Sequence, residues 1–228
     1  MAKKASMKKI ITSWEARTQN KLEVNPSNKV VICGWVDENL QYSHRKPNTR
    51  EKYYRTRIIN FQRTSINFVP ILIHENIITK KEIRRKWMEV IGMMVSHNGK
   101  LENGKTYLAE SVLVLDYNLY DQENEMLVNS YENQVYLQGN LCEDAFSMTG
   151  GKVDFMLAVN TKCSKVAYIP CIALGEEEKK IAIKLKKGER IGLYGKFQCR
   201  HFDKKLPNGK KEKRISYEII ARRIDLLG

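Results

Sequence analysis

The C-terminal half of the chain contains short stretches in which apolar and polar residues alternate or apolar residues form brief runs. Five such stretches occur, at residues 135–141, 155–159, 167–173, 191–198 and 215–227. A period of two residues is typical of a half-buried β-strand. Asn208-Gly209, just before the last stretch, is a hairpin signal. This half of the chain is therefore predicted to form five strands, with Phe155 in the core.

One stretch between the third and fourth predicted strands has a different character. Residues 176–188 read EEEKKIAIKLKKG, with acidic residues first, lysines later and Gly188 at the end. This polarity complements a helix dipole, and a glycine commonly ends a helix. Five strands with a helix between the third and fourth are the element order of the OB-fold, a small Greek-key barrel that binds oligonucleotides.

The N-terminal half repeats this pattern in the same order. Residues 28–34 match 133–139, residues 68–71 match 168–171, residues 90–92 match 190–192, and Tyr107 matches Tyr217. The offsets between the halves differ only by loop-sized amounts, which indicates two copies of one domain. Residues 80–88 occupy the helix position of the first copy, and Asn98-Gly99 and Asn103-Gly104 offer turns before its fifth strand.

The predicted fold class is all-β, with two tandem five-stranded OB-fold Greek-key barrels, a short helix in each and an N-terminal helical extension. The predicted boundaries are 1–27 for the extension, 28–116 for the first barrel, 117–132 for an acidic linker and 133–228 for the second barrel. In the extension, Met7, Ile10, Ile11 and Trp14 form one apolar helical stripe. This stripe is expected to dock on the protein's own barrel or on a sister subunit.

The chain is strongly basic, with 40 Lys and Arg against 26 Asp and Glu and a formal net charge of +14. Basic residues neutralise phosphates and release counterions, so nucleic acid is a candidate partner. A merely solvated lysine-rich surface is the alternative. The 42% of hydrophobic residues exclude a disordered chain. No apolar run is long enough to span a bilayer and no signal-peptide core is present, so a cytoplasmic protein is expected.

The residue types of catalysis and metal binding occur without the spacing that either requires. The five cysteines include no C-x-x-C pair, and the four histidines include no H-x-x-x-H pair. The sequence also contains no glycine-rich phosphate loop and no G-x-S-x-G motif. We therefore expect no metal, no cofactor and no enzymatic activity.

The second copy resembles bacterial single-stranded DNA-binding protein. The strings that carry the resemblance are NQVYLQGNL, TGGKVDFMLAVN, AYIPCIALG, LKKGERIGLYGKFQCRHF and YEIIARRIDLL. The first copy looks like a diverged relative, through NKVVICGW, NFVPI and VIG. The related primosomal protein B family shares this fold and stays open as an alternative. Cys163 and Leu174 depart from the family, which often carries stacking aromatics at these two places.

The resemblance implies sequence-independent binding of single-stranded DNA in DNA replication, recombination or repair. Replication or repair proteins are possible further partners. Because single-barrel family members commonly form tetramers, a chain with two barrels is expected to form a homodimer. A primosome-type assembly factor and an RNA-binding OB-fold protein are the alternative functions.

Binding of single strands without sequence preference requires exposed aromatic faces on which bases stack. The candidates are Tyr168, Phe202, Phe68, Trp35, Tyr53 and Tyr54. Tyr168 and Phe202 match family positions associated with stacking, and Phe68 is the repeat partner of Tyr168. Core packing is the alternative for Tyr168, Phe68 and Trp35.

Two predicted basic loops supply the charge, at the positions that OB-folds use for oligonucleotides. The loop at 204–214 contains Lys204, Lys205, Lys210, Lys211, Lys213 and Arg214, and Arg200 precedes it. The loop at 37–57 contains Arg45, Lys46, Arg50, Lys52, Arg55 and Arg57. A further basic cluster at 80–86 lies on the predicted first helix, which OB barrels place away from the groove, and we interpret it as a solvated face.

Overall fold

The computed structural model describes residues 27–46, 49–78, 82–100, 104, 106–121, 132–148, 151–161, 165–205, 209 and 211–228. The predicted N-terminal helix and most of the predicted linker lie outside these residues. The strands of the first half are β1 (Asn28–Val36), β2 (Gln41–Arg45), β3 (Lys52–Gln62), β4 (Ser65–His74), β5 (Trp87–Lys100) and β6 (Thr106–Tyr120). The elements of the second half are β7 (Asn133–Leu141), β8 (Phe146–Met148), β9 (Lys152–Asn160), β10 (Val166–Ala173), α2 (Glu176–Ala182), β11 (Arg190–Lys205) and β12 (Lys211–Leu226).

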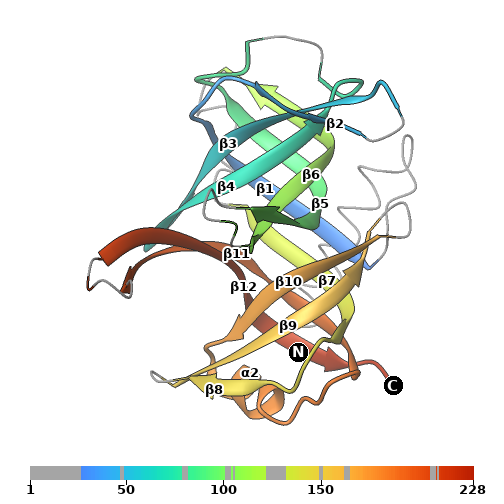
Figure 1. Cartoon of the computed structure of the whole chain (residues 1–228), viewed down its shortest axis with the longest axis vertical. Helices are drawn as coiled ribbons and strands as arrows, with labels where there is room; N and C mark the ends of the chain where they lie inside the picture. The colour runs from blue at the N-terminus through green and yellow to red at the C-terminus, as the bar shows by residue number, and fades with distance from the viewer. Residues whose placement is uncertain are drawn as a thin grey trace.

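The strands form one continuous sheet in the order β2-β3-β4-β6-β5-β1-β7-β11-β12-β10-β9-β8. Two additional pairings, β3 with β1 and β9 with β7, close this sheet into two barrels. Figure 1 shows the barrels one above the other along the long axis, with α2 at the far end of the second. Each barrel has one parallel pair, β4 with β6 and β10 with β12, among antiparallel pairs. The prediction of an all-β protein with tandem OB-fold barrels is confirmed.

The seam between the barrels is the antiparallel pairing of β1 with β7, and it is symmetric. Val30 faces Val135, its own repeat equivalent, at the centre of the ladder. Pairs on either side exchange roles, because Asn28 faces Leu137 while Ile32 faces Asn133. A pairing in which each residue meets the equivalent of its partner is the geometry of a two-fold interface. The two barrels of one chain therefore associate as two identical subunits would.

Two buried asparagines repeat the same local device in each barrel. The side chain of Asn28 donates to the carbonyl oxygen of Met94 at 2.9 Å and accepts from its N–H at 2.8 Å. Asn133 makes the same two hydrogen bonds with Phe197, both at 2.8 Å. Because a buried amide must satisfy its polar groups internally, these bonds fix β5 and β11 against the seam strands. They also establish Met94 and Phe197 as equivalent positions.

Glycines at the strand bends permit backbone contacts that any side chain would block. The ladder register shifts between Ile91 and Gly92 in the first barrel and between Tyr194 and Gly195 in the second. A Cβ atom on Gly92 would lie 2.4 Å from the carbonyl oxygen of Leu113, and one on Gly195 would lie 2.3 Å from that of Ile220. Gly195 is thus the equivalent of Gly92, and the sequence match of 90–92 with 190–192 is wrong by three residues.

The match of Tyr107 with Tyr217 is also wrong. Met94 faces Val112 and Phe197 faces Ile219, so counting back along β6 and β12 pairs Glu110 with Tyr217. Tyr107 is instead equivalent to Arg214. The sequence match fails because the two hairpins differ in length: Met94 and Val112 are 18 residues apart in the sequence, whereas Phe197 and Ile219 are 22 apart. The match of 68–71 with 168–171 holds, since Ile71 and Cys171 face the equivalent residues Val112 and Ile219.

The helix predicted over 80–88 is absent from the described residues 82–88. Trp87 and Met88 begin β5, where Met88 is fully buried and faces Gly34 of β1. Arg85 has a φ of 61°, which lies in the left-handed region and cannot continue a right-handed helix. Trp87 and Met88 are therefore held by strand pairing, and the helix prediction is wrong for the described residues of the first barrel. In the second barrel the predicted helix forms as α2.

The predicted turn at Asn98-Gly99 is also absent, because both residues lie inside β5 and Gly99 faces Tyr107 of β6. The turn falls later, where Gly104 has a φ of 76°. β6 extends to Tyr120, so residues 117–120 of the predicted linker belong to a strand. A continuous apolar core fills both barrels and includes Phe155, as the sequence predicted.

Candidate nucleic-acid interface

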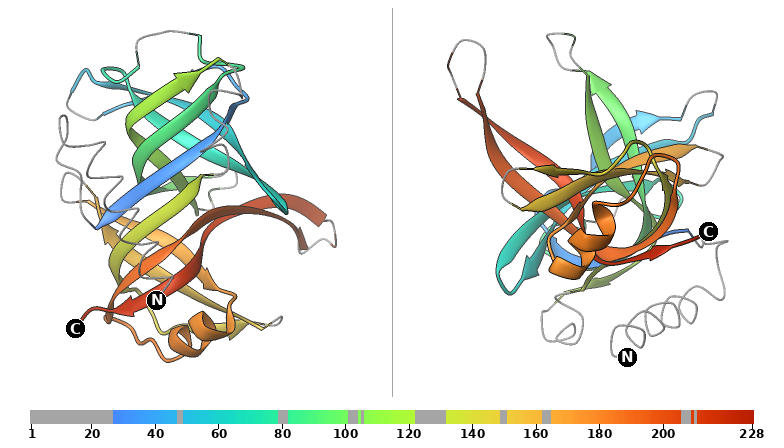
Figure 2. Two further views of the ribbon diagram at one scale, coloured as in Figure 1. Left: turned by 180° about the vertical axis from the view of Figure 1, so that it is seen from behind. Right: turned by 90° about the horizontal axis from the view of Figure 1, so that it is seen from below.

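The predicted loop at 204–214 is largely a β-ribbon. β11 and β12 pair without interruption from Gly195 to Lys205, well beyond the barrel. This β11–β12 ribbon projects from the body of the molecule in Figure 1, and in the view from below it diverges from the β5–β6 ribbon (Figure 2). The antiparallel ladder satisfies the backbone N–H and C=O groups of both strands along this length. A paired ribbon thus takes the place of the described part of the predicted loop.

One face of the β11–β12 ribbon combines an exposed ring with two cationic side chains. Phe202 is 36% exposed, and the guanidinium carbon of Arg200 lies 5.6 Å from its ring centroid. Arg214 faces Phe202 across the ladder and therefore lies on the same side. Arg200 also lies 3.6 Å from Oε1 of the buried Glu218. The three predicted residues are thus brought together by the hairpin register.

Lys211 and Arg214 of the β11–β12 ribbon each pair with a carboxylate at the surface. Lys211 Nζ lies 3.9 Å from Asp203, and Arg214 lies 2.9 Å from Glu212. Lys213 is exposed. Surface pairs of this kind are weak and can exchange for a phosphate. Lys210 and the side chains of Lys204 and Lys205 lie outside what the structure describes.

Tyr168 points outward from β10, between the buried residues Ala167 and Ile169. Its side chain is 48% exposed, which excludes the core alternative. Its backbone N–H donates to Ser96 Oγ of the other barrel at 2.8 Å. Phe68 makes the equivalent contact, donating its N–H to Cys199 Sγ at 3.2 Å. The outer aromatic of each barrel is therefore anchored on the projecting ribbon of the other.

Phe68 differs from Tyr168 in being half-buried. Its ring meets His201 edge-on at 6.1 Å between centroids and lies 5.0 Å from the guanidinium carbon of Arg57. Arg57 in turn pairs with both Asp37 and Glu38. Arg57 therefore lies between these two carboxylates and the Phe68 ring.

The second predicted basic loop is the β2–β3 hairpin with its flanking turns. Tyr53 stacks on His44 at 4.9 Å between centroids, and Tyr54 meets Tyr42 edge-on at 6.5 Å. Both predicted tyrosines are half-buried. The basic residues of this hairpin that are exposed and have no recorded ion pair within the described part of the chain are Arg45, Arg50 and Arg55.

Two further residues of the β2–β3 hairpin contact carboxylates, Lys46 through its side chain and Lys52 through its backbone. Lys46 pairs with Glu51 at 3.1 Å, and the Lys52 backbone N–H donates to Glu75 Oε1 at 2.9 Å. Trp35 is half-buried and meets Trp87 edge-on at 6.0 Å, in a cluster that includes Phe61. Trp35 therefore packs against other aromatic side chains, as the core-packing alternative for this residue predicts.

Histidines that the sequence did not single out lie beside the β2–β3 hairpin. The pKa of His44 is lowered, mainly by burial and then by the charges of His97 on β5 and Lys165 at the start of β10. The charges that act on His44 thus come from both barrels. Scattered single histidines carry no sequence pattern, so this grouping depends on the fold.

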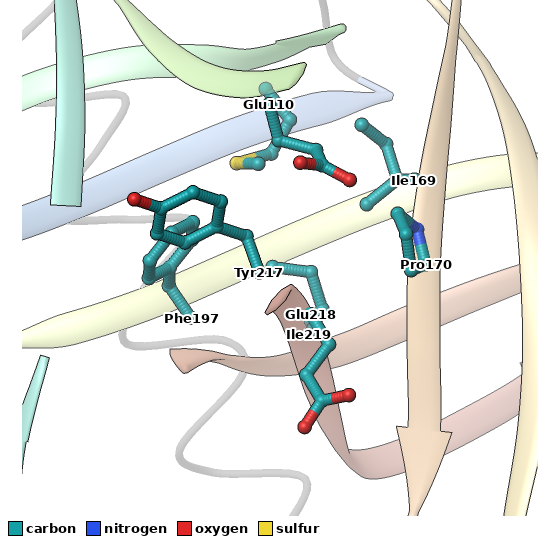
Figure 3. Close-up of a pocket in the computed structure, with 8 residues that line it drawn as sticks. Glu110, Ile169, Pro170, Phe197, Tyr217, Glu218 and Ile219 are labelled. Atoms are coloured by element: carbon teal, nitrogen blue, oxygen red, sulfur yellow. The ribbon is translucent and has the colours of Figure 1, made fainter. Parts of the chain in front are cut away.

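A crevice between the barrels gathers three ionisable residues (Figure 3). Its lining is Met94, Glu110, Ile169, Pro170, Phe197, Tyr217, Glu218 and Ile219. Burial raises the pKa of Glu110 to about 7, and it also raises the pKa values of Tyr217 and Glu218. Glu110 and Tyr217 occupy equivalent positions of the two barrels. The carboxylate of Glu218 points away from the other two (Figure 3). No sequence signal marks this crevice, because Glu110 and Tyr217 come from different barrels.

Within the residues that the structure describes, no group of three or more His, Cys, Asp or Glu side chains could hold a metal ion. In the same part of the chain, no helix has the length and apolar character needed to cross a membrane.

Part of the chain matches a known protein family. Residues 132–227 match the model of the Single-strand binding protein family. The second barrel carries the single-strand binding protein pattern. The resemblance inferred from its sequence strings is confirmed. A search of curated protein sequences gives no significant match.

Two solved structures of the single-stranded DNA binding protein from Thermus aquaticus share the two-barrel fold. A deletion mutant that also carries an Arg-to-Ala substitution superposes with a TM-score of 0.64 at 16% identity, covering 88% of this chain and 94% of that one. The wild-type protein superposes with a TM-score of 0.62 at 17% identity, covering 88% and 93%. At this identity the likeness establishes the fold, and it extends over both barrels.

Proposed function

We propose that the protein binds single-stranded DNA without sequence preference, in DNA replication, recombination or repair. The observation that carries the proposal is the face of the β11–β12 ribbon on which Phe202 lies exposed between Arg200 and Arg214. A ring can stack on any base, and flanking guanidiniums can hold the adjacent phosphates. The family match of the second barrel supports the same function.

Tyr168 supplies a second exposed ring in this proposal. Because its strand is tied to Ser96 of the other barrel, a strand that stacks on Tyr168 passes close to both barrels. The exposed Arg45, Arg50 and Arg55 extend the basic surface over the β2–β3 hairpin. A single strand fits this surface better than a duplex, since bases stack on side chains only when they are free of their partners.

The test is a titration of the full chain with oligo-dT, with an RNA oligomer of the same length and with a DNA duplex, all in one buffer. We expect tight binding to oligo-dT, much weaker binding to the duplex, and a log–log salt slope of about −0.7 for each phosphate contacted. Lys180→Ala is the control. Lys180 is exposed on α2, far from the proposed DNA-binding surface, so removing its charge should leave the salt slope unchanged.

Equal affinity for duplex and single strand in the same salt would contradict the proposal. A flat salt response would contradict the role of the basic surface. Preference for the RNA oligomer would favour an RNA-binding protein instead. Binding of a protein partner without any nucleic-acid affinity would favour an assembly factor.

We also propose that two chains associate into a homodimer that presents four barrels. The symmetric β1–β7 seam supports this proposal, because it shows that barrels of this kind pair as equivalent units within the chain. Light scattering at micromolar concentration should give twice the mass of one chain. The mass of a single chain under these conditions would contradict the proposal.

A further inference from the structure

The two projecting ribbons correspond residue by residue. Met94 and Phe197 are equivalent through their bonds to Asn28 and Asn133, and no register shift follows either of them along its ribbon. Counting outward from these anchors, Gly99 takes the position of Phe202. On the opposite strands, Tyr107 takes the position of Arg214. The facing pair Gly99–Tyr107 in the first barrel therefore corresponds to the facing pair Phe202–Arg214 in the second.

The ring of Tyr107 fills the space that a side chain at position 99 would enter. A Cβ atom on Gly99 would lie 2.4 Å from Cζ of Tyr107, 2.6 Å from Cε1 and 2.7 Å from the hydroxyl oxygen. The ring thus lies across the ladder over the glycine. It is 46% exposed, compared with 36% for Phe202. Both ribbons consequently carry one exposed ring at the same place, supplied by opposite strands.

The face of the β5–β6 ribbon that carries Tyr107 also carries His97. His97 is the equivalent of Arg200, and it lies on the same face as Tyr107 because the pairs His97–Ala109 and Gly99–Tyr107 are two residues apart on each strand. This face therefore has a histidine and a tyrosine at the places where the β11–β12 ribbon has Arg200 and Arg214.

We propose that Tyr107 is a base-stacking residue of the first barrel, in the place that Phe202 takes in the second. A bound single strand then contacts one exposed ring on each ribbon. The inference rests on the proposed function, which it deepens by assigning a contact to the first barrel. Sequence comparison of the two halves misses it, because the position equivalent to Phe202 holds a glycine and Tyr107 aligns with an arginine.

A purely structural role for Tyr107 is the competing explanation. An aromatic ring placed across a ladder can shield a strand glycine and stabilise the hairpin without touching a ligand. The two explanations differ in what should happen when the ring is moved rather than removed. The double variant Gly99→Phe with Tyr107→Arg recreates the facing pair of the second barrel, and it keeps an exposed ring while abolishing the glycine.

The test measures oligo-dT affinity and the number of nucleotides occluded per chain for the full-length wild type and for three variants. Tyr107→Ala should weaken binding roughly tenfold and shorten the occluded length. Phe202→Ala is the matched variant of the second barrel and should act similarly. The Gly99→Phe/Tyr107→Arg swap should restore affinity to within about threefold of the wild type, because the ring is back on the same face.

Several outcomes would overturn the inference. If Phe202→Ala weakens binding while a folded Tyr107→Ala binds like the wild type, the assignment of Tyr107 fails and the proposed function stands. If the wild type does not bind oligo-dT, both fail. If Tyr107→Ala does not fold, Tyr107→Trp decides the matter: added oligo-dT should quench its fluorescence more than that of the wild type. Equal quenching would overturn the inference.

Discussion

The two barrels share a frame and differ in the surfaces they present. The buried asparagines Asn28 and Asn133 and the bend glycines Gly92 and Gly195 occupy equivalent places and make equivalent contacts. On the outer face, the first barrel has Phe68 held by Arg57, whereas the second has an exposed Tyr168 that faces Ala158. Backbone geometry thus fixes the residues of the shared frame, while the outer positions differ in side chain and exposure between the two barrels.

The distribution of charge differs in the same way. In the first barrel the basic residues follow the β2–β3 hairpin, and Arg57 is neutralised by Asp37 and Glu38. In the second barrel they follow the β11–β12 ribbon, where Lys211 and Arg214 pair with Asp203 and Glu212. The second barrel therefore presents its aromatic and basic groups together. The first divides them between a hairpin and a support for Phe68.

The largest expected effect comes from removing two rings of the second barrel. Tyr168→Ala with Phe202→Ala should weaken oligo-dT binding at least about tenfold, since each lost stack costs roughly 1–3 kcal/mol. Tyr53→Ala with Phe68→Ala should weaken it less, because these rings are already stacked on His44 or held beside Arg57. Fluorescence titration compares the affinities, and circular dichroism checks that each variant is folded. A folded second-barrel variant that binds like wild type would contradict the placement of the groove.

The next effect concerns stability: the free energy of unfolding should depend on pH through Glu110 but not through Tyr217, its equivalent in the second barrel. Burial raises the pKa of Glu110 from 4.5 to about 7, so the folded state holds a proton that the unfolded state releases. This contribution to stability is present at low pH and is lost as the pH rises through about 7. The unfolding free energy of the wild type, relative to that of Glu110→Gln, should fall by roughly 2–3 kcal/mol between about pH 5 and pH 8.

Tyr217→Phe is the matched variant for this comparison. Burial moves the pKa of Tyr217 upward, away from this pH window, so its removal should shift stability by the same amount at every pH. Chemical denaturation of the three proteins across the window measures both effects. Parallel pH profiles for the wild type and Glu110→Gln would show that Glu110 does not titrate there.

The smallest effect distinguishes two arginines of one strand. Arg55 is exposed, while Arg57 pairs with Asp37 and Glu38. Arg55→Ala should reduce the magnitude of the log–log salt slope for oligo-dT by about 0.7, and Arg57→Ala should leave the slope nearly unchanged. The slopes are measured by titration over a series of salt concentrations. Equal losses would mean that the nucleic acid displaces the carboxylates from Arg57.

The local sequence pattern correctly predicted those features that depend only on which face of a strand or helix each residue occupies. Period-two alternation placed Phe155 in the core, and the polarity of residues 176–188 identified α2. The same reasoning failed at 80–88, where a charged segment with few apolar residues looked like a helix. Met88 instead pairs with Gly34 as part of a strand, and a pairing between residues so far apart in the sequence cannot be read from the neighbouring residues.

The sequence by itself determined the two-barrel architecture and the family pattern of the second barrel, because strand alternation and turn residues act over a few neighbouring positions. Only the tertiary structure decided which positions of the two barrels correspond. The segments that join equivalent strands differ in length, because Met94 and the facing Val112 are 18 residues apart in the sequence whereas Phe197 and the facing Ile219 are 22 apart. The correspondences of Tyr107 and Glu110 follow from the ladder register, which fixes which residue each side chain faces.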